Sequence, residues 1–359
     1  MRPEPEKAKP PELGGHEGVS GEGPTEVGLL SAADLGRTVD DYGSRKRRTN
    51  AVAEYLGGTS GQHLARRLFA CATWLRFRWW LDHDRVTLNA AKFCQLPLLC
   101  PNCARRRAAK QGAKVEEKLL HLAPSYDYWF ITLTVKNGHD LAERFNHLSK
   151  SFKTMRRLAR DHLKGTGRFV ELARAQGLLW SFEFTKSDHG WHPHVHMIAA
   201  LPKGSEPIRW GVEQVTGEVS QLRLDWESVT GDSTITHAEP VTMDNPRAGI
   251  AELVKYALKF SDLTVADTAH AYWTLRGRKL TECSGVMRGV VLPEDLDLLD
   301  DELTGAYMDL LYRWHGQSYS LADTTSGAGE SVLESRRITT PGAPHGTNTV
   351  GGNQGQPHA

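Results

Sequence analysis

Residues 179–201 read LWSFEFTKSDHGWHPHVHMIAAL, and this stretch decides the fold that we expect. Two apolar-rich runs, 179–185 and 194–201, flank the segment 186–193, which contains Gly190 and a proline. Short runs of this kind are typical of strands, and the intervening residues favour a turn. The stretch therefore predicts a β-hairpin.

The predicted hairpin brings metal-binding side chains together. His194 and His196 are two residues apart on a strand, so both imidazoles project from one face. On the other strand the aromatic residues take the core face, which leaves Glu183 on the opposite face. Two imidazoles and one carboxylate suit Mg²⁺ or Mn²⁺ with open positions for phosphate oxygens. His192 is interpreted as a turn residue, and surface histidines beside a turn are the alternative interpretation of the pair.

Strands and helices alternate irregularly around this hairpin. We expect a strand over residues 128–135, a helix over 140–164 and a further helix over 249–260. This pattern favours an α+β domain, built on a central antiparallel sheet that is flanked by helices.

The helix expected over 249–260 carries a candidate nucleophile. Its polar stripe consists of Glu252, Lys255, Tyr256 and Lys259. Nearby ammonium groups and a metal would help the Tyr256 phenol to attack a phosphodiester. Glu252 is placed to accept a proton or to activate a water molecule. The alternative interpretation is an exposed helix with an ordinary Glu–Lys pair.

Four of the five cysteines cluster early in the chain and predict a structural zinc site. The four ligands would be Cys71, Cys94, Cys100 and Cys103. Cys283 is remote in sequence and is not assigned a partner. Arg105, Arg106 and Arg107 follow the cluster directly, so we expect this module to present phosphate-binding cations on a helix over 104–122. Buried, metal-free cysteines are the alternative interpretation.

Composition sets the expected limits of the domains. The net charge is only +1, but basic residues gather locally, as they do at positions 45–48. No apolar run is long enough to cross a bilayer and the N-terminus has no apolar leader, so a cytoplasmic protein is the default expectation. The expected division of the chain is a disordered tail (1–44), a Cys-rich zinc-binding and basic helical region (50–123), a catalytic domain (124–290), a C-terminal helical segment (291–323) and a second disordered tail (324–359).

Taken together, these motifs resemble the rolling-circle replication initiators of small plasmids in Gram-positive bacteria, within the His-hydrophobic-His endonuclease superfamily. FITLTVKN at 130–137 is similar to the family's first motif, GWHPHVHM at 190–197 to its metal-binding motif and ELVKYALK at 252–259 to its nucleophile motif. FCQLPLLCPNC at 93–103 is similar to its upstream cysteine segment. The order and the spacing of the motifs are also those of the family.

The resemblance implies a DNA-nicking enzyme. Tyr256 would attack the origin strand, leaving a 5′-phosphotyrosyl link and a free 3′-OH, and Glu252 would promote hydrolysis at termination. We also expect Thr132 and Thr134, in the first motif, to contact DNA. The implied partners are plasmid origin DNA, single-stranded at the nick site, together with a host helicase and a DNA polymerase. No membrane partner is expected, and self-association into a homodimer is left open.

Other functional classes fit fewer of the residues. A non-catalytic zinc-dependent DNA-binding regulator would explain the cysteines and arginines but would leave Tyr256 and the histidine pair unused. A metal-dependent hydrolase acting through water alone would give Tyr256 no task. A mobilisation relaxase or a single-strand transposase would use the same chemistry on another target, and the cysteine segment favours replication over these.

Overall fold

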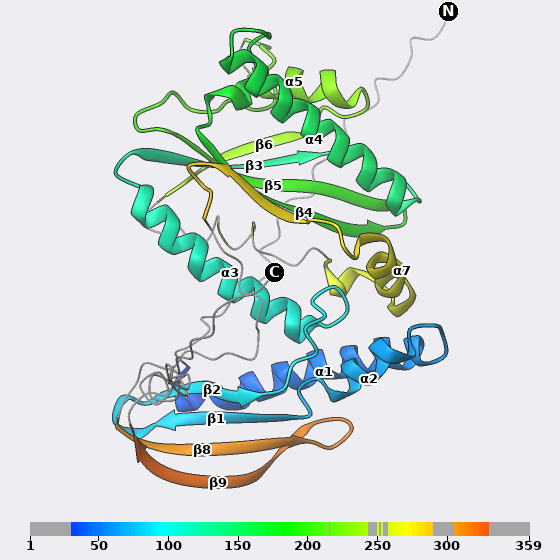
Figure 1. Cartoon of the computed structure of the whole chain (residues 1–359), viewed down its shortest axis with the longest axis vertical. Coiled ribbons are helices and arrows are strands. Elements are labelled where there is room, and N and C mark those ends of the chain that lie inside the picture. Colours follow the sequence, from blue (N-terminus) through cyan, green and yellow to red (C-terminus); the bar gives the residue numbers. More distant parts are fainter. Residues whose placement is uncertain are drawn as a thin grey trace, which may run out of the picture.

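The computed structural model describes residues 30–214, 216–242, 250, 253, 258–289 and 305–329. The fold is α+β and contains two antiparallel sheets, as Figure 1 shows. No described helix combines the length and the apolar character needed to cross a membrane.

The larger sheet holds the predicted hairpin at its centre. Its strand order is β6-β3-β5-β4-β7, and every pairing is antiparallel. The strands are β3 (Tyr126–Thr134), β4 (Gly177–Ser187), β5 (Gly190–Pro202), β6 (Thr236–Val241) and β7 (Thr281–Gly285). The predicted β4–β5 hairpin is confirmed, but its turn is shorter than expected because pairing continues to Ser187 and Gly190.

Gly190 is required where the hairpin turns. Its φ is +93°, in the region that favours glycine, and an added Cβ would lie 2.5 Å from the carbonyl oxygen of Gly138. Gly138 and Trp191 exchange two backbone hydrogen bonds of 3.1 Å and 2.7 Å. These bonds tie the start of β5 to the segment that follows β3, so the hairpin has a fixed position on the sheet.

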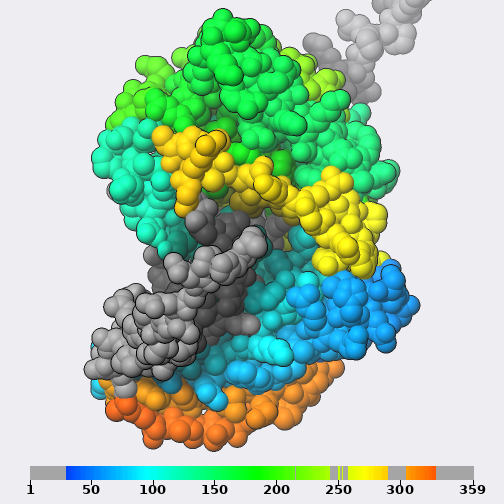
Figure 2. All heavy atoms as spheres, in the orientation of Figure 1, coloured from blue at the N-terminus to red at the C-terminus, as the bar shows by residue number. Residues whose placement is uncertain are grey.

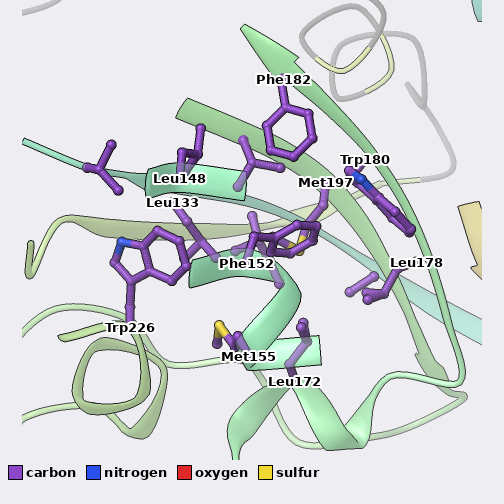
Figure 3. Packing of buried hydrophobic residues seen from close by; sticks show 14 of the residues in the cluster. Leu133, Leu148, Phe152, Met155, Leu172, Leu178, Trp180, Phe182, Met197 and Trp226 are labelled. Atoms are coloured by element: carbon purple, nitrogen blue, oxygen red, sulfur yellow. The ribbon is translucent and has the colours of Figure 1, made fainter. Parts of the chain in front are cut away.

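Helices cover both faces of this sheet. α4 (Leu141–Leu163) and α5 (Gln221–Thr230) lie on one face, where they enclose the largest apolar core. Figure 3 shows Phe152 and Met155 of α4 packed among side chains of the strands, such as Trp180 and Met197. The Asp140 carboxylate caps α4 by accepting hydrogen bonds from two backbone N–H groups.

α3 (Pro101–Leu122) crosses the other face of the large sheet. Val115 and Leu119 of this helix pack against Tyr128 and Phe130 of β3 and Ile198 of β5. The Tyr128 hydroxyl donates a 2.8 Å hydrogen bond to the Leu119 carbonyl. The helix predicted over 104–122 is therefore confirmed, and it begins three residues earlier, at Pro101.

The smaller sheet belongs to the cysteine-containing part of the chain. Its order is β2-β1-β8-β9, with strands β1 (Trp74–Trp80), β2 (Arg85–Ala91), β8 (Gly305–Trp314) and β9 (Tyr319–Gly329). α1 (Leu35–Gly57) and α2 (Gln62–Ala70) complete the unit. Elsewhere and within it, the described chain also forms short 3₁₀ turns, namely η1 (Ala32–Asp34), η2 (Leu81–His83), η3 (Glu171–Arg174) and η4 (Phe260–Asp262). Segments far apart in sequence thus share one core.

α7 (Val265–Leu275) connects the two parts of the molecule. The Asp267 carboxylate accepts a 2.5 Å hydrogen bond from Lys186 at the end of β4. On the other side, Arg48 of α1 donates to the Leu263 carbonyl and the Thr268 hydroxyl. In Figure 2 the yellow surface of α7 meets the blue surface of the N-terminal helices.

The structure corrects the expected N-terminal boundary. The predicted tail over 1–44 is wrong from residue 30 onward, because α1 starts at Leu35 and the chain before it pairs with β2. Leu35, Val39 and Tyr42 follow helical spacing and are buried, so this stretch does contain an apolar face. Residues 1–29 lie outside the described part.

Two C-terminal expectations are also wrong. The helical segment predicted over 291–323 contains strand β8 and the start of β9, and residues 324–329, assigned to a tail, belong to β9. Met308, Leu310 and Tyr312 recur with the two-residue period of a strand and pack into the smaller core. Residues 290–304 and 330–359 lie outside the described part.

Candidate active site and cysteine cluster

The hairpin register assembles the three predicted metal ligands. Glu183 of β4 pairs directly with His194 of β5, and His196 is the next residue on the same face. The Glu183 Oε2 atom lies 2.9 Å from His194 Nε2 and 2.8 Å from His196 Nε2. The three donor groups therefore converge, as the sequence predicted.

The environment of Glu183 keeps its carboxylate ionised. Burial alone would raise the pKa of Glu183, but hydrogen bonds and charge interactions with the two histidines outweigh it and hold the pKa well below its usual range. Both Glu183 and His196 are buried, while His194 is partly exposed. The negative charge of the Glu183 carboxylate lies beside the Nε2 atoms of both histidines, and this arrangement favours binding of a cation.

Thr132 fixes the orientation of His196. Its hydroxyl lies 3.0 Å from His196 Nδ1, and the two residues are direct partners across β3 and β5. The His196 ring also stacks on Phe130 at 5.4 Å between centroids and 17° between planes. With Nδ1 engaged, Nε2 is the nitrogen that points toward Glu183. Thr132, expected to contact DNA, thus supports a ligand histidine.

His192 is not the turn residue that we expected. β5 begins at Gly190, so His192 follows the same alternation as His194, and their ring centroids are 5.3 Å apart. Burial and the neighbouring His194 lower the pKa of His192, which favours its neutral form. The proline at 193 does not break the strand, because its neighbours still pair with β4.

The donor set fits a divalent cation. Among the residues that the structure describes, Glu183, His194 and His196 form one of two groups whose ligand atoms all lie within 4.8 Å of one another. Three protein ligands on a partly open face leave coordination positions for water or for phosphate oxygens. The arrangement is therefore suited to phosphodiester chemistry.

Three of the four predicted catalytic residues lie outside the described residues. These are Glu252, Lys255 and Tyr256. Their described neighbours are informative: Ile250 and Leu253 are helical and pack in the core beneath α3, on the sheet face that carries the metal-binding triad. Leu258 forms a parallel bridge with Phe184, the residue after Glu183.

Lys259 departs from the predicted helix. Its backbone is extended, a 3₁₀ turn follows it, and its ammonium pairs with Asp262 at 3.1 Å. The helix expected to run to residue 260 therefore ends before Leu258, which pairs with a strand instead. Pairing with the edge of the hairpin region replaces the last helical turn, so Lys259 does not lie on a helical stripe.

The four predicted cysteines form the second candidate metal centre. The Cys71 sulfur lies 3.6 Å from that of Cys100 and 3.8 Å from that of Cys103, and the Cys94 and Cys103 sulfurs are 3.4 Å apart. Four thiolates at 2.3 Å from a tetrahedral zinc ion would be about 3.8 Å apart. The cluster therefore fits zinc, while Cys283 lies apart in β7.

Local backbone and side-chain groups are arranged around these sulfurs. The residues after the first two cysteines, Ala72 and Gln95, have positive φ values of 50° and 58°. The Cys94 N–H donates to the Cys71 sulfur, and Thr49 lies 3.4 Å from the Cys100 sulfur. The Cys94 N–H is a donor directed at sulfur, and such a donor stabilises a thiolate, so it supports metal binding at Cys71.

Lys46 is a residue near the site that our sequence interpretation missed. Lys46 is 1 % exposed, and its Nζ donates to the Phe69 carbonyl at 2.7 Å. Burial lowers the pKa of Lys46, and the nearby cysteines partly oppose this effect. In sequence, Lys46 belongs to the group of basic residues at positions 45–48. Helical spacing from Tyr42 to Thr49 would have placed it on the buried stripe of α1.

The arginines after the cluster are not equivalent. Arg106 is 5 % exposed and stacks on Phe93 with its guanidinium carbon 4.4 Å from the ring centroid, so the protein itself engages much of this side chain and the phosphate contact stays a prediction. Arg105 is partly exposed and Arg107 is exposed. Thr134 is buried and pairs with His194 across the sheet, which also argues against a direct DNA contact.

Comparisons with known proteins identify related chains. Residues 85–309, more than half of the chain, match a family model described as "Replication protein". A curated relative named "Protein rep" from Lactiplantibacillus plantarum is 26 % identical over 280 residues, which cover 74 % of this chain and 84 % of that protein. A "Protein rep" from a Bacillus species is 25 % identical over 246 residues, 65 % of this chain and 74 % of the relative. No solved structure matches significantly.

Proposed function

Because the chain belongs to this replication protein family, we propose that it initiates plasmid rolling-circle replication by cutting one origin strand with Tyr256. The observation that carries the proposal is the convergence of Glu183, His194 and His196 on one sheet face. Ile250 and Leu253 pack on that same face, and Leu258 lies beside Phe184. These described residues bring both flanks of the predicted nucleophile segment to the sheet that carries the triad, which supports the proposal.

In the proposed reaction, Glu183, His194 and His196 hold a divalent cation, Mg²⁺ or Mn²⁺. When bound, the cation supplies a Lewis acid that polarises a phosphate oxygen. Glu183 contributes the negative charge of the site, and the Thr132 hydroxyl keeps the His196 ring in its ligand orientation. The protein thus provides a preorganised site for a phosphodiester.

Tyr256 is the proposed nucleophile. Its phenolic oxygen attacks the phosphorus, the bond from phosphorus to the 3′-oxygen breaks, and that oxygen takes up a proton to become a free 3′-OH. The 5′-phosphate stays bonded to Tyr256, while the 3′-OH primes a DNA polymerase. Lys255 lowers the cost of forming the phenolate, and Glu252 activates the water that hydrolyses a later phosphotyrosyl link at termination.

The four cysteines have a different proposed role. Cys71, Cys94, Cys100 and Cys103 hold a structural zinc ion that fixes α1, α2 and the start of α3 relative to one another. Arg105 and Arg107, at the start of α3, then bind origin phosphates. Arg106 stays within the protein, stacked on Phe93.

Covalent capture of DNA tests the nucleophile. Single-stranded oligonucleotides that tile the origin and carry a 3′-end label are incubated with the protein and Mn²⁺, then separated on a denaturing protein gel. We expect labelled wild-type protein and no label on Tyr256→Phe. Tyr55→Phe is the matched control, because Tyr55 is exposed on α1, outside both candidate sites. Equal labelling of wild type and Tyr256→Phe would exclude Tyr256 as the nucleophile.

The same assay separates the proposal from the other functional classes. A non-catalytic DNA-binding regulator would bind origin DNA without forming an adduct. A relaxase or a transposase would form an adduct on a different DNA, and the plasmid that carries the gene would still replicate with Tyr256→Phe. We expect that plasmid to lose replication instead.

A further inference from the structure

An exposed aromatic pair lies at the edge of the sheet that carries the metal-binding triad. Trp210, in the loop between β5 and α5, is 47 % exposed, and its ring centroid lies 4.5 Å from that of His237 on edge strand β6. Ile235, two residues before His237, is 64 % exposed. Large side chains this exposed contribute little to the core, and their aromatic and apolar surface is open to a ligand.

The sheet register places His237 on the same face as the triad. Thr132 of β3 pairs with His237 on one side and with His196 on the other. Directly paired residues point to the same face of a sheet. The neighbours of His237 in β6, Thr236 and Ala238, are buried on the opposite face, which agrees with this alternation.

The spacing suits a nucleotide a few positions away from the cleavage point. His237 and His196 are two strands apart, about 10 Å at a strand spacing of about 4.8 Å. That distance corresponds to about three stacked nucleotides at about 3.4 Å each. A single DNA strand with one phosphate bound at the triad would therefore reach Trp210 and His237 within a few nucleotides.

The charges beside Trp210 and His237 indicate which path a bound DNA strand would take. Arg209 is exposed next to Trp210, so its guanidinium is accessible to a phosphate. Glu239, exposed two residues beyond His237, would repel phosphates. The favourable path for a DNA strand thus passes Arg209 and Ile235 and avoids Glu239.

We infer that Trp210, His237 and Ile235 form a base-stacking subsite for single-stranded DNA flanking the scissile phosphate, with Arg209 binding the adjacent backbone. Aromatic side chains next to a cation are the usual means of holding unpaired bases, and every base offers a face for stacking. The inference rests on the proposed single-strand cleavage, and it adds to that function the residues that hold the substrate.

Binding and crosslinking test the subsite without any cleavage step. In the Tyr256→Phe background, the Kd for a short mixed-sequence oligonucleotide is measured for Trp210→Ala, Trp210→Tyr and Trp273→Ala. Trp273 is the matched control, because it is 39 % exposed on α7 and packs with Arg276 instead of lying on the sheet face. Oligonucleotides carrying 5-iodouracil are then crosslinked with ultraviolet light, and the attached peptide is identified by mass spectrometry.

We expect Trp210→Ala to weaken binding about ten-fold, the loss of one base–aromatic stack, and Trp210→Tyr to recover most of it. Trp273→Ala should bind like the parent, and crosslinks should map to Trp210 or His237. Equal Kd values for Trp210→Ala and Trp273→Ala, or crosslinks confined to other peptides, would overturn the inference. A failure of the proposed function would instead appear as no covalent adduct on Tyr256, whatever the Kd values are.

Discussion

The two candidate metal centres differ in how they are enclosed. The cysteine cluster has four ligands, all of them buried, at the junction of α1, α2 and α3. The triad of Glu183, His194 and His196 has three ligands on a sheet face, and His194 is partly exposed. One centre is closed and the other is open.

The number and exposure of the ligands indicate which centre is suited to a structural role and which to catalysis. A complete set of four thiolates leaves no position for a substrate and contributes its binding free energy to folding. The three side chains of the hairpin need no metal to converge, because backbone pairing between β4 and β5 already holds them together. We therefore expect loss of metal to unfold one region and merely to inactivate the other.

The largest effect is expected at the cysteine cluster. Cys100→Ser should remove one of four ligands and much of the roughly 10–16 kcal/mol that structural zinc contributes, so α1–α3 and the smaller sheet should lose their cooperative unfolding transition. Zinc content by atomic absorption and the thermal transition by circular dichroism check this. Cys283→Ser is the control, since that thiol lies outside the cluster. A zinc-free Cys100→Ser protein with the wild-type transition would show that the closed site is not structural.

A smaller effect on folding but a large one on activity is expected at the triad. Glu183→Gln keeps the shape of the side chain but removes the charge that two imidazoles face, so Mn²⁺ affinity should fall by more than the roughly 10- to 100-fold typical of supporting residues. Isothermal titration with Mn²⁺ and the adduct assay measure the loss. The melting temperature should stay close to that of the wild type. An unfolded Glu183→Gln protein would break the contrast between the two centres.

The smallest effect is expected from the residue behind the triad. Thr132→Val removes the hydroxyl that contacts His196 Nδ1 and should weaken Mn²⁺ binding and nicking by about 10-fold, the lower end for a supporting residue. Thr134→Val is the matched control, because Thr134 is the cross-strand partner of His194 on the same strand, yet its hydroxyl makes no hydrogen bond to either histidine in the described structure. If Thr132→Val instead weakened DNA binding with unchanged Mn²⁺ affinity, Thr132 would be a DNA contact after all.

Local sequence patterns predicted the hairpin and both ligand sets. Alternation around Glu183 fixed which side chains share a face, and two-residue spacing did the same for His194 and His196. The cysteines were recognisable because Cys100 and Cys103 are close in sequence and Cys94 is nearby. In each case the chemistry depends on neighbours within one element or on one tight turn.

Contacts between distant segments were not predictable in the same way. β8 joins β1 across more than two hundred residues, and no local pattern indicates such a partner. Arg106 and Lys46 look like solvent-facing cations in sequence, yet packing against Phe93 and the cysteine cluster buries both. The subsite at Trp210 likewise depends on a loop that folds back onto an edge strand.

The sequence by itself determined the α+β class, the hairpin, the two sets of candidate metal ligands and the order of the family's motifs, because periodicity and ligand spacing act over a few residues. Tertiary structure alone decided that the C-terminal strands complete the cysteine-containing unit and that Thr132 supports His196. It also decided which cations are buried. The reason is physical: burial and strand pairing join residues that the chain separates widely, and their free energy belongs to the folded whole.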